Sequence, residues 1–200
     1  MRYTIRPATS ADLDTLMQLR SEAEAWLRQA GIQQWTEDYA EHGHRVLRDA
    51  VERGVTWLIT TTEGEPVGTV TLNGPDHDFW RDEDKPDDAV YVYKMIVARG
   101  HDGRGLGDAI LNWSGHKAVE AGRSWVRLDC RRDNYRLHGY YKARAFEHVR
   151  TVSPPPRPTN SGALFQRGAG VTADVPLAAG VERATLAERT ADDMKRRGTA

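Results

Sequence analysis

The alternation and spacing of hydrophobic residues predict a chain of mixed strands and helices. Tyr3 and Ile5 alternate with polar neighbours before Pro7, which predicts a short first strand. A first helix should follow, because Thr9 and Asp12 have the spacing of a capping box and Gly31 provides a stop signal. Its apolar residues recur at helical spacing: Leu13, Leu16, Met17, Ala23, Trp26 and Leu27.

The middle of the chain continues the mixture of elements. After a polar loop with two large aromatic residues, a second helix is expected from about His44 to Gly54. Two β-rich runs, 55–60 and 67–72, are joined by Glu63-Gly64-Glu65-Pro66 and predict a hairpin. An acidic, aromatic insertion then covers residues 76–88.

A strand over 90–97, a loop rich in glycine and charge, and a helix ending near Gly122 come next. The elements expected after them are a strand at 125–129, a short helix over 134–143, a strand at 146–152 and a last strand at 163–166. This order predicts one α+β domain on a mixed sheet over residues 1–170. Residues 171–200 are rich in alanine and mixed charge, and are expected to be a helical (about 182–197) or disordered tail.

Composition excludes several classes of protein. A formal net charge of -1 gives no electrostatic basis for binding nucleic acid or an anionic membrane surface. The sequence contains no uninterrupted apolar run long enough to span a membrane, and the N-terminus has no secretion signal, so we expect a cytoplasmic protein. The single cysteine, Cys130, fits a reducing compartment and excludes an internal disulfide. The histidines show no spacing that predicts a metal site.

The strand, glycine-rich loop and helix of residues 90–111 predict an anion-binding site. Backbone N–H groups and the positive end of a helix dipole meet at Gly103-Arg104-Gly105-Leu106-Gly107. A Walker A loop is excluded because no Gly-Lys-Ser/Thr follows. A dinucleotide fingerprint is excluded because the sixth position is Asp108 or Ile110 rather than glycine.

With these residues, the chain resembles the GNAT superfamily of N-acetyltransferases. Its signature is a strand followed by Gln/Arg-x-x-Gly-x-Gly/Ala, which Arg104-Gly105-Leu106-Gly107 matches at its end. Asp102 occupies the Gln/Arg position and departs from the signature. A second block, Asn134 to Phe146, resembles the family's Asn-x6-Tyr-x4-Phe motif, with Ala145 in place of the usual glycine. The resemblance covers about residues 2–167.

The resemblance implies both a fold and a cofactor. The expected fold is a central, mixed, mostly antiparallel sheet of six to seven strands flanked by about four helices. The expected cofactor is acetyl-CoA, with its pyrophosphate on the glycine loop and its pantetheine arm beside the preceding strand. The residues implied to bind it are Met95, Val97, Asp102, Gly103, Arg104, Gly105, Gly107, Asp108 and Asn134.

The same resemblance implies N-acetyl transfer to a primary amine by direct attack. Tyr141 would protonate the leaving thiolate. The acceptor is expected to be a small-molecule amine, with a protein amine as the alternative, and a homodimer is a further alternative left open. Trp35 and Trp80 are the aromatic residues expected at the acceptor site. Cys130 is interpreted as a small apolar filler rather than a nucleophile.

Three questions stay open at this level. The general base is not identified, and the candidates are Glu37, Asp76, His77, Asp78, Asp87 and Asp88. The insertion is either a lid that attracts a cationic amine or a solvated loop. The competing class of function is a non-catalytic acyl-CoA-binding or regulatory protein with the same fold.

Overall fold

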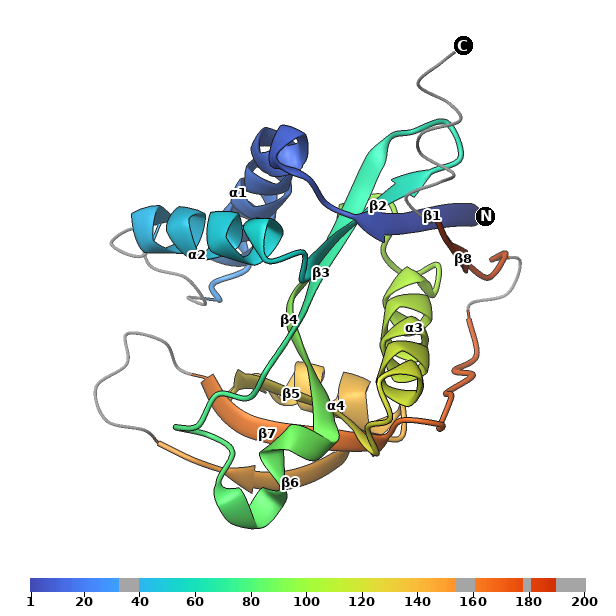
Figure 1. The fold of residues 1–200 in the computed structure, drawn as a ribbon. Helices are drawn as coiled ribbons and strands as arrows, with labels where there is room; N and C mark the ends of the chain where they lie inside the picture. Colours follow the sequence, from blue (N-terminus) through green and yellow to red (C-terminus); the bar gives the residue numbers. More distant parts are fainter. Residues whose placement is uncertain (33–39, 154–160, 178–180, 190–200) are drawn as a thin grey trace.

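The computed structural model describes residues 1–32, 40–153, 161–177 and 181–189, and its centre is one eight-stranded sheet (Figure 1). The strands lie in the order β6-β7-β5-β4-β3-β2-β1-β8, with parallel pairing at β4–β5 and β1–β8 and antiparallel pairing elsewhere. The strands are β1 (Arg2–Pro7), β2 (Thr56–Thr61), β3 (Pro66–Asn73), β4 (Ala89–Val97), β5 (Trp125–Arg131), β6 (Glu147–Thr151), β7 (Ser161–Gly168) and β8 (Thr185–Glu188).

In the described ranges, four α-helices cover the two faces of the sheet (Figure 1). They are α1 (Leu13–Gln29), α2 (Ala40–Glu52), α3 (Leu106–Glu120) and α4 (Tyr135–Lys142). α1 and α2 pack on one face through Leu16, Leu19 and Leu47. α3 and α4 pack on the other, where Ile110 and Tyr141 join the main core. The predicted α+β architecture is therefore confirmed.

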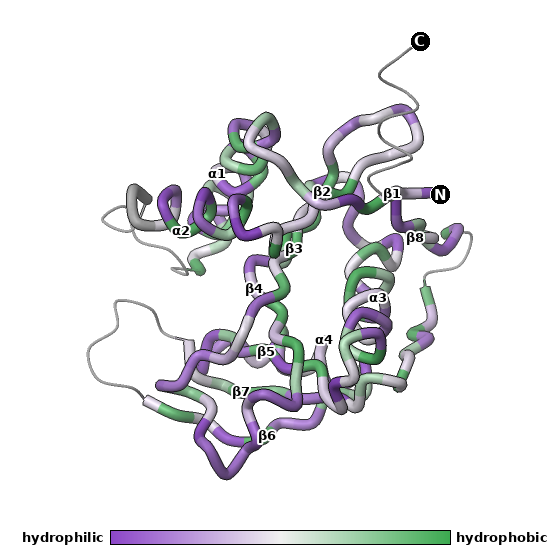
Figure 2. Tube along the Cα trace, viewed as in Figure 1, coloured by the Kyte–Doolittle hydropathy of each residue, from purple (hydrophilic) through white to green (hydrophobic). Residues whose placement is uncertain are grey.

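Local sequence signals place most of these elements. Thr9 and Asp12 form the expected capping box, with the Thr9 N–H donating to Asp12 Oδ2 at 2.8 Å, just before α1. The second helix begins at Ala40 rather than near His44, and it continues through Gly43. Figure 2 shows hydrophobic residues along the central strands and α3, and a hydrophilic β3–β4 connection.

The C-terminal tail differs from its prediction. Residues 185–188 form β8, a parallel edge strand beside β1, and not part of a helix beginning near Glu182. The pairing joins Tyr3 to Leu186, which packs against the main core while its neighbours Thr185 and Ala187 are exposed. This alternation of exposed and buried side chains covers only a few residues. The surrounding sequence has a composition that favours a helix, so the alternation does not stand out as a strand signal. The predicted helix also covers residues 190–197, which lie outside the described residues.

No helix in the described ranges combines the length and the apolar character that crossing a membrane would require.

Candidate active site

The loop between β4 and α3 presents a series of backbone N–H groups without internal acceptors. Gly105 is the N-cap of α3 and has φ = +79°, a left-handed conformation that favours glycine. Within the described residues, the N–H groups of residues 103–108 donate to no protein acceptor. These groups lie at the positive end of the α3 dipole. The loop therefore has the donors and the electrostatics that an anion requires.

Asp102 is held within this loop. Its Oδ1 accepts the Gly100 N–H at 3.1 Å, and its Oδ2 lies 3.5 Å from Arg99 Nη1. The carboxylate therefore shapes the turn, and the Arg99 guanidinium offsets its charge. This pairing explains how aspartate is tolerated at the position where the family signature has Gln or Arg. A direct contact between Asp102 and a cofactor stays a prediction.

Asp108 ties the start of α3 to α4. The side chain is buried, with Oδ1 accepting from Arg144 Nε at 2.5 Å and from the Tyr140 hydroxyl at 3.1 Å. Its other oxygen, Oδ2, is buried without a hydrogen-bond partner in the part of the chain that the structure describes, and the contact with the cofactor expected for Asp108 stays a prediction. Its backbone N–H is still one of the groups available at the helix start.

The strands β4 and β5 diverge beside this loop. They pair only from Ala89 with Trp125 to Tyr91 with Arg127. Beyond that point, β4 contains a bulge where Lys94 has φ = +48°. The Met95 side chain then packs against the first turn of α3, close to Gly107. The part of β4 that carries Met95 and Val97 thus has an unpaired edge facing the gap, next to the loop.

Tyr141 lies on α4 against the β5 side of this gap. Asn134 caps the helix, with its Oδ1 accepting the Leu137 N–H at 3.0 Å. The Tyr141 ring packs against Phe146 and Phe165, with centroids 5.7 Å apart in both cases. Burial raises the pKa of the Tyr141 phenol above its ordinary value, with smaller contributions from Cys130, Tyr140 and Asp129. The phenol is therefore protonated near neutral pH and able to donate.

Asp129 is the acidic group at the gap that the sequence reasoning missed. It lies near the end of β5, half-buried, with Ser161 hydrogen-bonded to its carboxylate. It interacts electrostatically with Tyr93 on β4 and with Tyr141 on α4. Burial, and then the charge of Asp76, raises the pKa of Asp129 to about 6, against the effect of the Ser161 hydrogen bond. The available signal was an acidic residue between Leu128 and Cys130, which are both buried.

The β4–β5 gap thus has an anion-binding loop at one end, and the protonated phenol of Tyr141 and the carboxylate of Asp129, whose pKa is raised, lie beside it. A family model described as the acetyltransferase (GNAT) family matches residues 18–146, well over half of the chain.

The chain belongs to the GNAT family of acetyltransferases.

Relatives and solved structures agree with this assignment to an acyltransferase family. A curated relative, the uncharacterized N-acetyltransferase YesJ of Bacillus subtilis (strain 168), is 26% identical over 146 residues, covering 72% of this chain and 81% of its own length. A GNAT acetyltransferase structure from Listeria monocytogenes aligns with a TM-score of 0.68 and 23% identity, over 83% of this chain and 94% of that one. PaiA N-acetyltransferase from Thermoplasma acidophilum, solved in complex with coenzyme A, aligns with a TM-score of 0.64 and 17% identity, over 84% and 99%.

In this GNAT chain the acidic insertion is a packed cap and not a loose loop. Trp80 is only 1% exposed, with the Arg127 guanidinium 4.6 Å from its ring centroid. Asp84 pairs with Arg150, with O–N distances of 2.7 and 2.5 Å. The expectation that Trp80 contacts the acceptor is wrong, because core residues enclose its ring. Trp35 lies outside the described residues.

The structure also describes most of the residues that the sequence suggests as general bases. Asp76 interacts electrostatically with Asp129 and Tyr93, which puts it near the gap. Asp88 instead accepts the Ser124 N–H at 2.9 Å, a structural contact. The Asp78 N–H donates to Asp76 Oδ1 at 3.1 Å, and Glu37 lies outside the described residues.

Cys130 is buried in the core, as expected for a small apolar filler. Burial raises the pKa of the Cys130 thiol to about 12, which leaves it protonated and a poor nucleophile. In the described ranges, no group of three or more His, Cys, Asp or Glu residues is placed to hold a metal ion.

Proposed function

We propose that this GNAT chain transfers the acetyl group of acetyl-CoA to the primary amine of a small molecule. The observation that carries the proposal is the convergence at the β4–β5 gap. The loop of residues 103–108 lies at one end of the gap, and Tyr141 and Asp129 line it within electrostatic reach of each other.

The loop fits the pyrophosphate of coenzyme A. Its free N–H groups match the many acceptor oxygens of that group, and the α3 dipole favours its negative charge. Gly105 and Gly107 leave the backbone uncovered by side chains. A solved structural neighbour with this fold, PaiA of Thermoplasma acidophilum, holds coenzyme A. Bound acetyl-CoA supplies an activated thioester carbonyl at the gap.

The residues at the gap then handle the protons of the reaction. A primary amine arrives as its ammonium form, and Asp129, ionised above a pKa of about 6, accepts one of its protons. The amine nitrogen attacks the carbonyl and forms the amide bond as the carbon–sulfur bond breaks. Tyr141 donates its proton to the leaving sulfur and regains one from the new amide through solvent. Backbone N–H groups on the open edge of β4 polarise the carbonyl.

The charges on the acceptor side support a cationic substrate. The charge of Asp76 acts on Asp129 and raises its pKa, and a positive group beside Asp129 would offset this repulsion. A primary amine is such a group. The class of acceptor is thus a small cationic amine.

The test is a thiol-release assay with acetyl-CoA and a panel of polyamines, amino acids, aminoglycosides and short peptides. With any acceptor that is turned over, Tyr141→Phe should lower kcat by about 100-fold or more, because general-acid catalysis contributes that much. Coenzyme A affinity should stay unchanged. Tyr135→Phe, on the same helix but 78% exposed, is the matched control.

Two outcomes would contradict the proposal. If Tyr141→Phe retained the wild-type kcat, the assignment of the proton donor would be wrong. If the wild-type chain bound coenzyme A but acetylated no amine of the panel, a non-catalytic binding protein would be the better account.

A further inference from the structure

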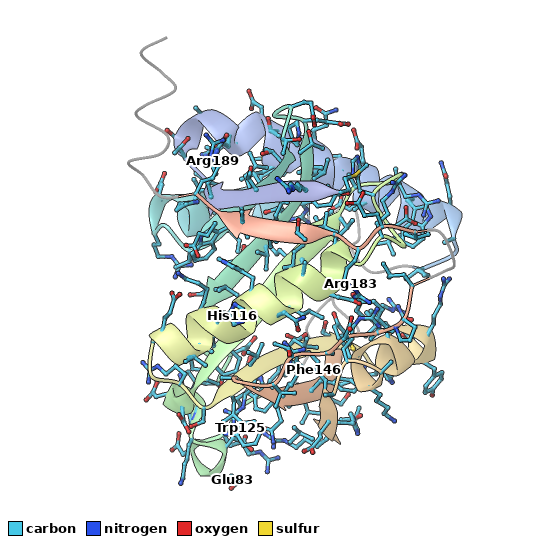
Figure 3. The ribbon with its side chains drawn as sticks, turned by 90° about the vertical axis from the view of Figure 1, so that its right-hand side faces the viewer. Glu83, His116, Trp125, Phe146, Arg183 and Arg189 are labelled. Atoms are coloured by element: carbon cyan, nitrogen blue, oxygen red, sulfur yellow. The ribbon has the colours of Figure 1, made fainter. Side chains whose placement is uncertain are left out.

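The chain continues past the family match and returns to the glycine loop. After β7, residues 171–177 run along α3 toward its N-terminus (Figures 1 and 3). The Asn112 side chain fixes this course, because its Nδ2 donates to the Ala173 carbonyl at 3.2 Å and its Oδ1 accepts the Ala173 N–H at 3.3 Å. We call residues 171–177 and 181–184 the C-terminal segment.

This segment contacts the loop at two points. The Ala184 N–H donates to the Arg104 carbonyl at 2.9 Å. Leu177 Cδ2 lies 3.5 Å from the position that a Cβ atom on Gly105 would occupy. The loop conformation is therefore held from outside by residues far along the chain, in addition to its own internal bonds.

β8 anchors the segment. It pairs with β1 over residues 2–5, and Glu188 accepts from Trp113 Nε1 at 3.0 Å and from Lys117 Nζ at 3.2 Å. Trp113 and Lys117 belong to α3, the same helix that begins at the loop. β8 and the glycine loop are thus connected through α3.

Arg183 brings a positive charge to the loop. Its Cγ lies 3.8 Å from the Cβ position of Gly105, and its guanidinium is partly exposed. Both of its described contacts use Nη2, with the Val175 carbonyl at 2.6 Å and Asp174 Oδ1 at 2.7 Å. Within the described residues, Nε and Nη1 have no acceptor. A cavity of about 430 Å³ borders Gly105 and Arg183, so there is open space beside them.

We propose that the C-terminal segment is part of the coenzyme A site, where it fixes the loop and Arg183 binds the phosphates of the cofactor. Asp102 leaves the family's Gln/Arg position without a donor, and Arg183 supplies one from a different part of the chain. The partner of Arg183 is the weakly held Asp174, whose side chain is 86% exposed. A phosphate group competes well with such a carboxylate. This inference rests on the proposed function, because it assumes that the loop holds coenzyme A.

The test measures coenzyme A affinity by calorimetry with full-length variants. Arg183→Gln keeps much of the side-chain stem and removes the charge, and it should weaken binding about tenfold, as expected for one lost charge-assisted contact. Asp174→Asn should have the opposite effect and tighten coenzyme A binding about two- to threefold, because it frees the Arg183 guanidinium. Arg189→Gln is the matched control, since Arg189 lies at the far end of β8 (Figure 3) and should not change the affinity.

Pantetheine, which carries no phosphate, separates charge from structure. Arg183→Gln should leave pantetheine binding and the melting temperature unchanged. Equal weakening of coenzyme A and pantetheine would overturn the phosphate role of Arg183, as would wild-type coenzyme A affinity in this variant. Failure of the wild-type chain to bind coenzyme A would instead overturn the proposed function, so the two failures are distinguishable.

Discussion

At the scale of single residues, burial raises the pKa of two groups at the β4–β5 gap, the phenol of Tyr141 and the carboxylate of Asp129. Tyr141 is enclosed by aromatic rings, and its phenol stays protonated. Asp129 is half-buried beside Ser161 and Asp76, and its pKa is raised toward neutrality. The family motif made the place of Tyr141 on a short helix predictable from sequence, and its role as proton donor stays a prediction. The place of Asp129 at the gap was not predictable, because one carboxylate inside a strand shows no periodicity. Its neighbours in space come from β4, β7 and the insertion.

The raised pKa of Asp129 gives a pH dependence. As a base Asp129 works only when ionised, so kcat/KM should rise with pH through about 6 and then level. Asp129→Asn should lose this rise and lower kcat about 100-fold. The same profile in both proteins would contradict the role of Asp129.

Stability provides the control for that variant. A carboxyl pKa raised in the folded state means that folding favours the protonated form. The stabilising contribution is therefore present below the unfolded pKa of Asp and is lost as pH rises through about 6. Asp129→Asn should consequently melt no lower than the wild-type chain at pH 8, so a loss of activity there would not reflect unfolding.

Gly107 gives a second prediction at this scale. A Cβ atom at this position would overlap the Tyr140 hydroxyl oxygen, which bonds to Asp108. Gly107→Ala should therefore displace Tyr140 and lower the free energy of unfolding by about 1–3 kcal/mol, the usual cost of overpacking. Chemical denaturation would measure the loss. In Tyr140→Phe the clash is removed, so adding Gly107→Ala to that variant should cost less; an equal cost in both backgrounds would contradict this explanation.

At the scale of elements, the central feature is the joining of α3 to α4. Asp108 near the start of α3 pairs with Arg144 just after α4, and the Arg144 guanidinium also lies over the Tyr140 ring, 3.4 Å from its centroid. The helices and their order were predictable from hydrophobic spacing and from Gly105. The pairing was not, because Asp108 and Arg144 are 36 residues apart and neither belongs to a local pattern.

Removing one member of this pair should be costly. Arg144→Met leaves the Asp108 carboxylate buried without its counterion, and should lower the free energy of unfolding by about 3 kcal/mol. Asp108→Asn combined with Arg144→Met should recover a large part of that loss. Denaturant titrations of the single and double variants measure the coupling, and strictly additive losses would show that the two side chains do not act as a pair.

At the scale of the whole molecule, the α+β architecture was predictable because each strand and helix has its own periodicity. The structures of the insertion and of the C-terminal tail were harder to predict. The insertion contains seven carboxylates, which suggested either a lid or a solvated loop, yet Arg127 and Arg150 from the distant strands β5 and β6 hold it in place. The tail carries few large apolar residues, but a parallel neighbour, β1, makes residues 185–188 a strand. Both outcomes depend on partners remote in sequence.

We propose that the loop of residues 103–108 holds coenzyme A for transfer at the β4–β5 gap. Calorimetric titration of coenzyme A into the full chain tests it most directly, with Gly105→Val as the comparison, because a β-branched residue is strained at φ = +79°. The account predicts one coenzyme A per chain, with a dissociation constant of about 1 mM or tighter, in the range of ordinary enzyme substrates, and at least tenfold weaker binding for Gly105→Val. Equal binding by both proteins would contradict the placement of the site, and no binding by the wild-type chain would contradict the function itself.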